Sequence, residues 1–339
     1  MNLVDRELLG LVDSDVLFFK LCLNEFVTFG LSDGIKIYRI DPFENVWEGR
    51  IGEIKLVEVL SVSPCRIAFV GTGKDPSLSP RKIIFYNTTT SKKIDDLSFP
   101  KTILSLDLNE TRFIVNTFDK IHIYETPKFE FQTSIDKETK GNSICALSKV
   151  GTRNLLAFPK KNFIQVYDLD SYELCCSVKC HNNPISSVGF GLNQSCLVTS
   201  SIIGTCIRIF QINKNNNSNN LKKIKEFKRG TRKAKIFQTS FIFNDKYLLV
   251  TSKHKTIHVF DIEKEKTFCK LHLKPDIPRI CGISKNNENQ IILITPEPNI
   301  LIYQLDVKNK KLAFIKSCSI DFNQEEQEES GEKGEKKDK

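Results

Sequence analysis

The segment Val27-Thr28-Phe29-Gly30-Leu31-Ser32-Asp33-Gly34-Ile35-Lys36-Ile37-Tyr38 contains the unit that decides the fold. Apolar and polar side chains alternate on both sides of the turn residues Ser32-Asp33-Gly34. This period of two around a glycine-containing turn is typical of an antiparallel β-hairpin. The second predicted strand ends in an aromatic residue, Tyr38.

The same unit occurs seven times along the 339 residues, and successive copies end in Tyr38, Tyr86, Tyr124, Tyr167, Phe210, Phe260 and Tyr303. A repeat of about 40 to 45 residues that holds several short strands is the signature of a β-propeller blade. The sequence therefore predicts an all-β, seven-bladed β-propeller of the WD40 type. A two-sheet β-domain without rotational symmetry is the alternative, and the regular recurrence of the unit argues against it.

The repeats place the propeller in residues 1–322 and leave residues 323–339 as a charged tail without apolar periodicity, which we expect to be disordered. A ring of blades leaves unpaired sheet edges unless its ends share strands. We therefore expect the segment Leu3–Val12 to complete the last blade. The asparagine-rich run Asn213–Asn220 is expected to be a low-complexity loop.

The composition, with 40% hydrophobic and 27% charged residues, is that of a globular protein. No apolar run is long enough for a membrane-spanning helix, and the first residues lack the apolar core of a secretory signal. The eleven cysteines are odd in number, so we expect reduced thiols in the cytosol. Cys176 and Cys180 form a C-x₃-C pair, but no second pair follows, so neither a metal nor another cofactor is predicted.

The formal net charge is +9, and because the tail is acidic the remaining body is still more basic. Residues 221–235 concentrate eight basic residues and one acidic residue. Such a run is often only a solvated face. In an extended chain, however, Lys228 and Arg229 project to opposite sides, towards different neighbouring blades, and Gly230 permits a close approach of the backbone. The pattern predicts an anion site, with a membrane surface or nucleic acid as the candidate partner.

Five stretches resemble the motifs of the PROPPIN family, the phosphoinositide-binding propellers that include the animal WIPI proteins. Phe227-Lys228-Arg229-Gly230-Thr231 is similar to the family's F-R-R-G-T signature. The other four stretches are Gly71–Lys82, Ser98–Leu104, His181–Ser186 and Gly204–Arg208.

This resemblance implies two shallow sites on the propeller rim for phosphatidylinositol 3-phosphate and phosphatidylinositol 3,5-bisphosphate. By motif position, the first site comprises Thr199, Ser201, Gly204, Thr205, Arg208 and Lys228. The second comprises His181, Arg229, Gly230, Ser252, Thr256 and His258. The blade-two loop with Pro80 and Arg81 resembles the family's docking region for the lipid-transfer scaffold of autophagy.

The sequence departs from the family pattern in two places. Lys228 stands where the family has its first arginine, and a lysine lacks the planar fork that binds phosphate with two hydrogen bonds. We therefore expect the first site to be weaker than the second. The family also has a long, partly apolar loop between the third and fourth strands of blade six, whereas only Glu263–Thr267 separates them here. Five charged and polar residues cannot bury apolar area in a bilayer, so we expect binding through headgroups and general electrostatics.

The sequence contains no phosphate loop that opens a helix and no nucleophile elbow, so we do not expect an enzyme. The function predicted is that of a phosphoinositide effector or scaffold in autophagy or related trafficking. Such a protein would be cytoplasmic and associate peripherally with endosomal, vacuolar or pre-autophagosomal membranes. A protein-interaction propeller without lipid specificity is the alternative. Nucleic-acid binding is a third class suggested by the basic body, although no nucleic-acid partner is expected.

Overall fold

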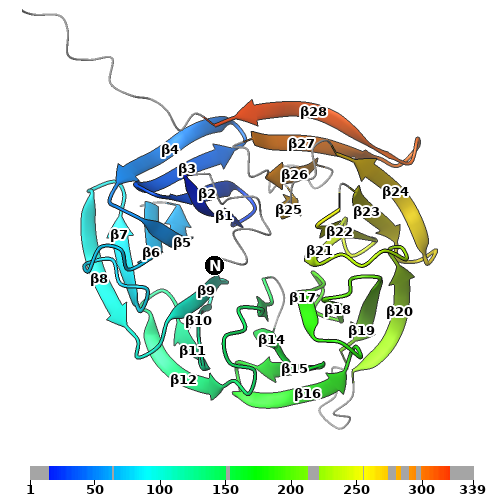
Figure 1. Cartoon of the computed structure of the whole chain (residues 1–339), viewed down its shortest axis with the longest axis horizontal. Coiled ribbons are helices and arrows are strands. Elements are labelled where there is room, and N and C mark those ends of the chain that lie inside the picture. Colours follow the sequence, from blue (N-terminus) through cyan, green and yellow to red (C-terminus); the bar gives the residue numbers. More distant parts are fainter. Residues whose placement is uncertain are drawn as a thin grey trace, which may run out of the picture.

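The computed structural model describes residues 15–62, 65–149, 153–212, 221–254, 256–273, 280–283, 290–294 and 299–320. These residues form seven four-stranded antiparallel sheets arranged as blades around a central axis (Figure 1). Within the described residues, no helix has the length and apolar composition needed to cross a bilayer. The predicted all-β, seven-bladed propeller is confirmed. The predicted tail, the asparagine-rich loop and Leu3–Val12 lie outside the described residues.

Each blade is a run of four consecutive strands from the axis to the rim. Blades one to four comprise β1 (Val16–Cys22), β2 (Phe26–Leu31), β3 (Gly34–Ile40), β4 (Phe43–Arg50); β5 (Ile54–Val62), β6 (Cys65–Gly71), β7 (Lys82–Asn87), β8 (Lys92–Ser98); β9 (Ile103–Leu108), β10 (Arg112–Thr117), β11 (Lys120–Glu125), β12 (Glu130–Asp136); and β13 (Ala146–Leu147), β14 (Leu155–Lys160), β15 (Phe163–Asp168), β16 (Glu173–Lys179). Blade five comprises β17 (Ile185–Phe190), β18 (Cys196–Ser201), β19 (Cys206–Gln211) and β20 (Lys222–Lys228). Blade six comprises β21 (Ile236–Ile242), β22 (Tyr247–Ser252), β23 (Thr256–Asp261) and β24 (Lys266–His272). Blade seven comprises β25 (Ile280–Ile283), β26 (Gln290–Ile294), β27 (Asn299–Asp306) and β28 (Lys311–Ser319).

The aromatic residue that marks each sequence repeat lies on the third strand of its blade. In all seven blades the ladder between the third and fourth strands shifts register at this aromatic, for example between Ile37 and Tyr38 and between Val259 and Phe260. A bulge of this kind bends the strand and increases its twist. The repeat visible in the sequence therefore coincides with a recurring bend of the outer strand.

The hydrophobic core is divided among the interfaces between neighbouring blades. Each buried apolar cluster contains residues from two adjacent sheets, and together the clusters cover every interface around the ring. Between blades five and six, for instance, Phe227 packs on Phe260 with 5.0 Å between ring centroids. Both faces of each sheet are therefore largely buried, and polar side chains reach solvent at the strand ends, on the outer strands and along the central channel.

The ring closes by side-chain packing between blade one and blade seven. Val16, Phe19 and Phe29 of blade one share a buried cluster with Ile292 and Ile302 of blade seven. Among the described residues the last sheet contains four strands, β25 to β28. The segment Leu3–Val12, predicted to complete this blade, lies outside the described residues. Packing closes the ring because the two facing sheets each present a continuous apolar surface.

One buried cation lies in the core between blades two and three. Lys55, on the inner strand β5, is 9% exposed, and its Nζ donates to the carbonyl oxygen of Ile103 at 2.9 Å. Burial lowers the pKa of Lys55 to about 8, from an ordinary value of 10.5. In the unfolded chain Lys55 keeps its proton up to a higher pH than in the folded protein. The buried charge therefore opposes folding at neutral pH. This cost in folding free energy disappears as the pH rises from about 8 to about 10.5.

We expect Lys55→Met to raise the free energy of unfolding at pH 7 by about 1–2 kcal/mol, because it removes a desolvated charge at the loss of one hydrogen bond. The gain should shrink when the same thermal unfolding experiment is repeated at pH 10. Lys128→Met, at a side chain that is 80% exposed, is the control and should leave stability nearly unchanged. A gain that does not depend on pH would contradict the buried-charge explanation.

Candidate functional site

The basic segment of residues 221–235 forms the outer strand of blade five and the connection to blade six. Lys222–Lys228 is β20, and Arg229 to Lys235 lead to β21. Lys228 is exposed and lies opposite Cys206 in the ladder, whereas Arg229 is 7% exposed. The two cations therefore face opposite sides of the blade, as the alternation along an extended strand predicts.

Residues predicted for the first site line up across the blade-five face that bears Lys228. Thr199 pairs with Arg208 in the β18–β19 ladder, and Arg208 pairs with Glu226 in the β19–β20 ladder. Residues paired in this way share a face of the sheet. Ser201, two positions after Thr199, lies on the same face and is buried. This face looks towards blade four, because Nη1 of Arg208 donates to the carbonyl oxygen of Cys180.

His181, which the motif assigned to the second site, belongs with the first. Its Nε2 lies 3.0 Å from Oγ1 of Thr199. The reason is its position on the connection from β16 to β17, which enters blade five beside β18. Burial and the nearby charge of Arg208 lower the pKa of His181 to about 4, so the imidazole is neutral at physiological pH. The structure thus corrects the grouping that the sequence predicted.

Arg229 is held by backbone carbonyl groups. Its Nε donates to the carbonyl oxygen of Gly204 at 2.7 Å, and its Nη2 donates to the carbonyl oxygen of Arg232. Its own N–H donates to the carbonyl oxygen of Thr205 at 2.8 Å. Gly204 has φ = +63°, and a Cβ there would lie 1.8 Å from the carbonyl oxygen of Ala234, so only glycine fits. Gly204 and Thr205, predicted for the first site, therefore position the cation of the second.

A cavity of about 500 Å³ opens beside Arg229, between blades five and six. It is lined by Arg229, Gly230, Thr231, Arg232, His254, Thr256 and His272. A Cβ placed on Gly230 would meet nothing within 4 Å, so the backbone there is open to a ligand. Among the described residues that line it there is no carboxylate, and a cavity of this size suits a small polar ligand. Three residues predicted for the second site, Arg229, Gly230 and Thr256, meet here.

Ser252 and His258, also predicted for the second site, lie deeper in blade six behind this cavity. Each is less than 5% exposed, and Oγ of Ser252 and Nδ1 of His258 have no hydrogen-bond partner among the described residues. Burial and the charges of Lys270, Arg229 and His272 lower the pKa of His258 to about 4. A buried polar atom without a partner is costly, so these atoms are available to a ligand or to water.

The blade-two loop connects β6 and β7 and is anchored on blade three. The carbonyl oxygens of Pro80 and Arg81 accept hydrogen bonds from the N–H groups of Ile103 and Phe99. Gly73 has φ = +94°, and a Cβ there would lie 2.7 Å from the Pro80 ring. The backbone of the loop is thus fixed while the Arg81 side chain remains exposed. The structure does not bring these two residues near the basic segment.

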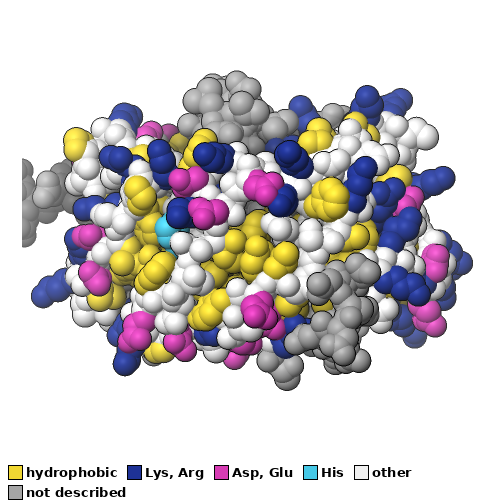
Figure 2. Space-filling model, turned by 90° about the horizontal axis from the view of Figure 1, so that it is seen from below, with side chains coloured by type: hydrophobic (Ala, Val, Ile, Leu, Met, Phe, Trp, Pro, Cys, Tyr) yellow, Lys and Arg dark blue, Asp and Glu magenta, His cyan; other side chains and the backbone are white. Residues whose placement is uncertain are grey.

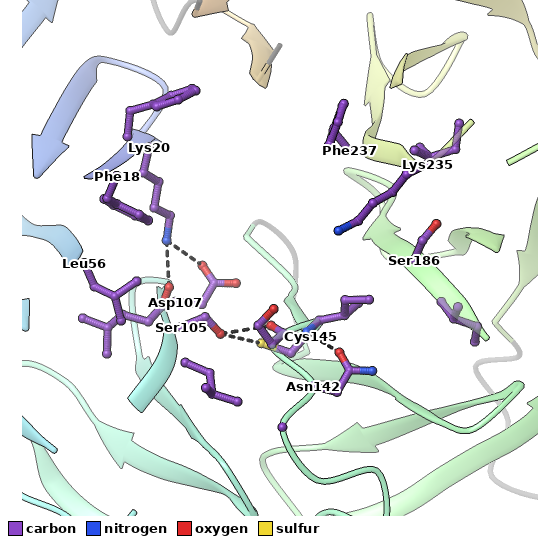
Figure 3. Close-up of a pocket in the computed structure, with 18 of the residues that line it drawn as sticks. Phe18, Lys20, Leu56, Ser105, Asp107, Asn142, Cys145, Ser186, Lys235 and Phe237 are labelled. Atoms are coloured by element: carbon purple, nitrogen blue, oxygen red, sulfur yellow. Dashed lines mark hydrogen bonds and ion pairs between the residues drawn. The ribbon is translucent and has the colours of Figure 1, made fainter. Parts of the chain in front are cut away.

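A larger cavity lies elsewhere, in the central channel, with a volume of about 680 Å³ (Figure 3). Most of its lining is apolar. Lys20 reaches into it from β1 and donates to Glu58 and to the carbonyl oxygen of Leu106, while Asp107 lies 3.7 Å from its Nζ. Figure 3 shows Lys235 and Phe237 on the opposite wall. Lys20 is therefore paired with two carboxylates, unlike Arg229, which backbone carbonyl groups hold.

Charged side chains are unevenly distributed on the rim. Figure 2 shows one side of it, with an apolar band in the middle and Lys and Arg gathered at the right-hand end, the side on which β20 lies. In blade six a tight turn joins β23 to β24, and Asp261 pairs with Lys266 in the ladder beside it. The short connection expected from the sequence is therefore present, and it offers no apolar loop.

The cysteines described by the structure are free thiols, and the described residues contain no group of three side chains suited to holding a metal ion. Cys176 and Cys180 pack in the apolar cluster between blades four and five. Burial raises the pKa of both thiols to about 12. Both therefore contribute to packing and are unreactive as thiolates at neutral pH.

Sequence reasoning missed several residues of the rim. Arg232 and Thr231 belonged to the basic segment but were not assigned to a site. His272 lines the cavity because it pairs with Thr256 in the β23–β24 ladder, a register that no sequence pattern signals. Glu226 was counted only as the single acid of the basic segment, yet its carboxylate binds Arg208 at 2.8 Å.

Comparison with known families gives one match over most of the chain, because the family model described as PROPPIN matches residues 28–272. Autophagy-related protein 18 of Yarrowia lipolytica is 29% identical over 261 residues, which cover 70% of this chain and 64% of that protein. The Debaryomyces hansenii protein of the same name is 26% identical, with 78% of this chain and 55% of that protein covered. The Dictyostelium discoideum protein, also of that name, is 26% identical, with 83% of this chain and 86% of that protein covered. The matches thus span less than two thirds of the two fungal relatives.

Solved structures give the same architecture. KlAtg21, in a complex with the coiled coil of AgAtg16, superposes with a TM-score of 0.79 at 21% identity, covering 91% of this chain and all of that one. Kluyveromyces lactis Hsv2 with its complete loop 6CD superposes with a TM-score of 0.74 at 18% identity, covering 91% of this chain and 99% of that one. At these identities the likeness supports the fold.

The opposed orientation of Lys228 and Arg229 has a consequence that a titration can measure. We expect Arg229→Ala to raise the pKa of His258 from about 4 towards the ordinary 6.5, because it removes a nearby positive charge and admits water. Lys228→Ala should leave the pKa of His258 unchanged, since Lys228 lies on the other face of blade five. Histidine NMR shifts followed against pH provide the measurement. Equal shifts in both variants would contradict the opposed arrangement.

Proposed function

Because this chain belongs to the PROPPIN family, we propose that it is a phosphoinositide-binding peripheral membrane propeller that acts as an effector or scaffold in autophagy or related trafficking. Its ligands would be phosphatidylinositol 3-phosphate and phosphatidylinositol 3,5-bisphosphate. The observation that carries this proposal is Arg229, a nearly buried cation that carbonyl groups hold beside a cavity with no carboxylate among its described lining residues. A fixed cation among hydroxyl and backbone donors is what phosphate recognition requires.

Two headgroup sites would flank blade five. The first would use Thr199, Ser201, Arg208, Lys228 and His181, on the face towards blade four. The second would use Arg229, Gly230, Ser252, Thr256 and His258, with Gly204 and Thr205 positioning Arg229 between the sites. Each site alone is shallow, and two sites on one rigid rim gain from effective concentration on the same membrane. Rim lysines would add about 1 kcal/mol each near an anionic surface.

Membrane attachment would depend on headgroups and electrostatics, because Glu263, Lys264 and Glu265 make the turn between β23 and β24 polar and its one apolar residue, Ile262, packs against the core. Such binding would weaken with salt. We infer a cytoplasmic protein that visits endosomal, vacuolar or pre-autophagosomal membranes, with the propeller in residues 1–322 and a separate tail in 323–339. We further propose a non-enzymatic role, in which the docked ring presents its remaining surface to other proteins.

We expect Arg229→Ala to weaken binding to vesicles that contain phosphatidylinositol 3-phosphate about tenfold, and Lys228→Ala to weaken it only a few-fold. The reason is that a planar guanidinium fixed by carbonyl groups binds phosphate more strongly than an exposed, flexible ammonium. Liposome flotation measures the difference, with Arg66→Ala, an exposed arginine on blade two, as the control. Equal losses in the two rim variants would count against the asymmetry.

The double variant Lys228→Thr, Arg229→Thr separates the alternatives. Loss of binding to 3-phosphorylated vesicles supports the lipid proposal. Binding that ignores the 3-phosphate would instead favour a protein-interaction propeller with a generic basic rim. RNA binding that survives the double variant would favour the nucleic-acid class.

We also propose that the anchored blade-two loop, through Pro80 and Arg81, docks the lipid-transfer scaffold of autophagy or a similar protein. Arg81→Ala should then abolish capture of that scaffold while leaving flotation with lipid vesicles intact, since the loop is fixed on blade three away from the basic segment. Co-purification with the tagged scaffold tests this. Undiminished capture by the variant would refute the docking role.

A further inference from the structure

We propose that Glu226 sets the charge preference of the first rim site, so that this site accepts a singly phosphorylated inositol headgroup and disfavours a bisphosphorylated one. The inference rests on the proposed phosphoinositide function and specifies how one of its two sites selects a ligand. It starts from an ion pair within the site itself. Arg208 and Glu226 lie opposite each other on β19 and β20, and Arg208 Nε donates to Glu226 Oε2 at 2.8 Å.

The contacts of Arg208 leave one part of its guanidinium for a ligand. Nε is bonded to Glu226, and Nη1 is bonded to the carbonyl oxygen of Cys180. Among the described residues, Nη2 has no hydrogen-bond partner. A phosphate that binds Nη2 therefore does not displace Glu226, which stays bonded to Nε of the same guanidinium.

The charge on Glu226 is permanent at physiological pH. Hydrogen bonding to Arg208, together with the charge of Lys223 at 3.1 Å, keeps the pKa of Glu226 below its usual range. Its side chain is 30% exposed, so the carboxylate is screened only in part. Lys228 lies two residues further along β20, on the same face. A ligand held between Arg208 and Lys228 therefore lies next to a fixed negative charge.

The second site contrasts with the first in this respect. Arg229 is held by the carbonyl oxygens of Gly204 and Arg232, and the part of the cavity lining that the structure describes has no carboxylate. The anchoring groups of the two arginines thus differ by one full negative charge. Repulsion between like charges grows in proportion to ligand charge, and each phosphate ester carries about −1.5 to −2. The first site therefore discriminates against an additional phosphate more than the second.

Glu226→Gln isolates the effect of the charge. The glutamine side chain has nearly the same shape, and its Oε1 can still accept the hydrogen bond from Arg208 Nε. Orientation of the guanidinium is preserved while the negative charge is removed. The matched control is Glu130→Gln, which makes the same change in net charge at an exposed carboxylate on β12 in blade three.

The experiment measures dissociation constants for vesicles that contain phosphatidylinositol 3-phosphate or phosphatidylinositol 3,5-bisphosphate at equal mole fraction. Both substitutions are made in the unchanged chain and in an Arg229→Thr background, in which only the first site remains intact. In that background we expect Glu226→Gln to tighten binding about threefold for the monophosphate and about tenfold for the bisphosphate. Glu130→Gln should change neither lipid appreciably. A thermal unfolding curve for each variant shows that it is folded.

Three results would overturn the inference while leaving the proposed function standing. The first is an equal gain in Glu226→Gln and Glu130→Gln, which would mean that only net charge matters. The second is an equal gain for both lipids, and the third is weaker binding by Glu226→Gln. If instead the unchanged chain binds vesicles regardless of the 3-phosphate, the proposed function itself fails, and the inference with it.

Discussion

The structure depends on the burial of both faces of every sheet between two neighbouring blades. Each blade packs on the next through one apolar cluster, and the last interface, between blades seven and one, follows the same rule as the others. A single hairpin or sheet would expose its apolar faces, so the ring is stable only as a whole. The same constraint limits where chemistry can occur, because polar side chains find solvent at strand ends, on the outer strands and along the central channel.

The candidate site arises where this packing stops. At the outer edge of blade five, the aromatic contact between Phe227 and Phe260 is the last contact of the apolar interface. The next two residues of the chain are the cations Lys228 and Arg229. Alternation along the strand sends one cation to each side of the blade. One run of sequence thereby serves two interfaces. The hydroxyl groups on one side come from blade five itself, next to His181 of the connection from blade four, and those on the other side come from blade six.

The two cationic environments differ more than their similar positions suggest. Carbonyl groups hold Arg229 and leave its charge uncompensated, while a carboxylate holds Arg208 and offsets part of its charge. Neutral histidines accompany both arginines, since burial keeps the pKa of His181 and of His258 low. The central channel has a larger cavity, but its cation Lys20 is matched by Glu58 and Asp107. Arg229 therefore differs from Lys20 in being held by neutral carbonyl groups rather than by carboxylates.

The sequence by itself determined the fold, because a period of two, a glycine-containing turn and a terminal aromatic are local properties that repeat along the chain. It also located the two cations and predicted their opposed directions, since alternation in a strand needs no tertiary information. What only the tertiary structure decided was which groups meet across strands and between blades. His181 joined Thr199 because the connection into blade five passes beside β18, and Glu226 met Arg208 because of the β19–β20 register. Ring closure by packing was likewise decided by apolar surfaces that face each other only once the chain has come full circle.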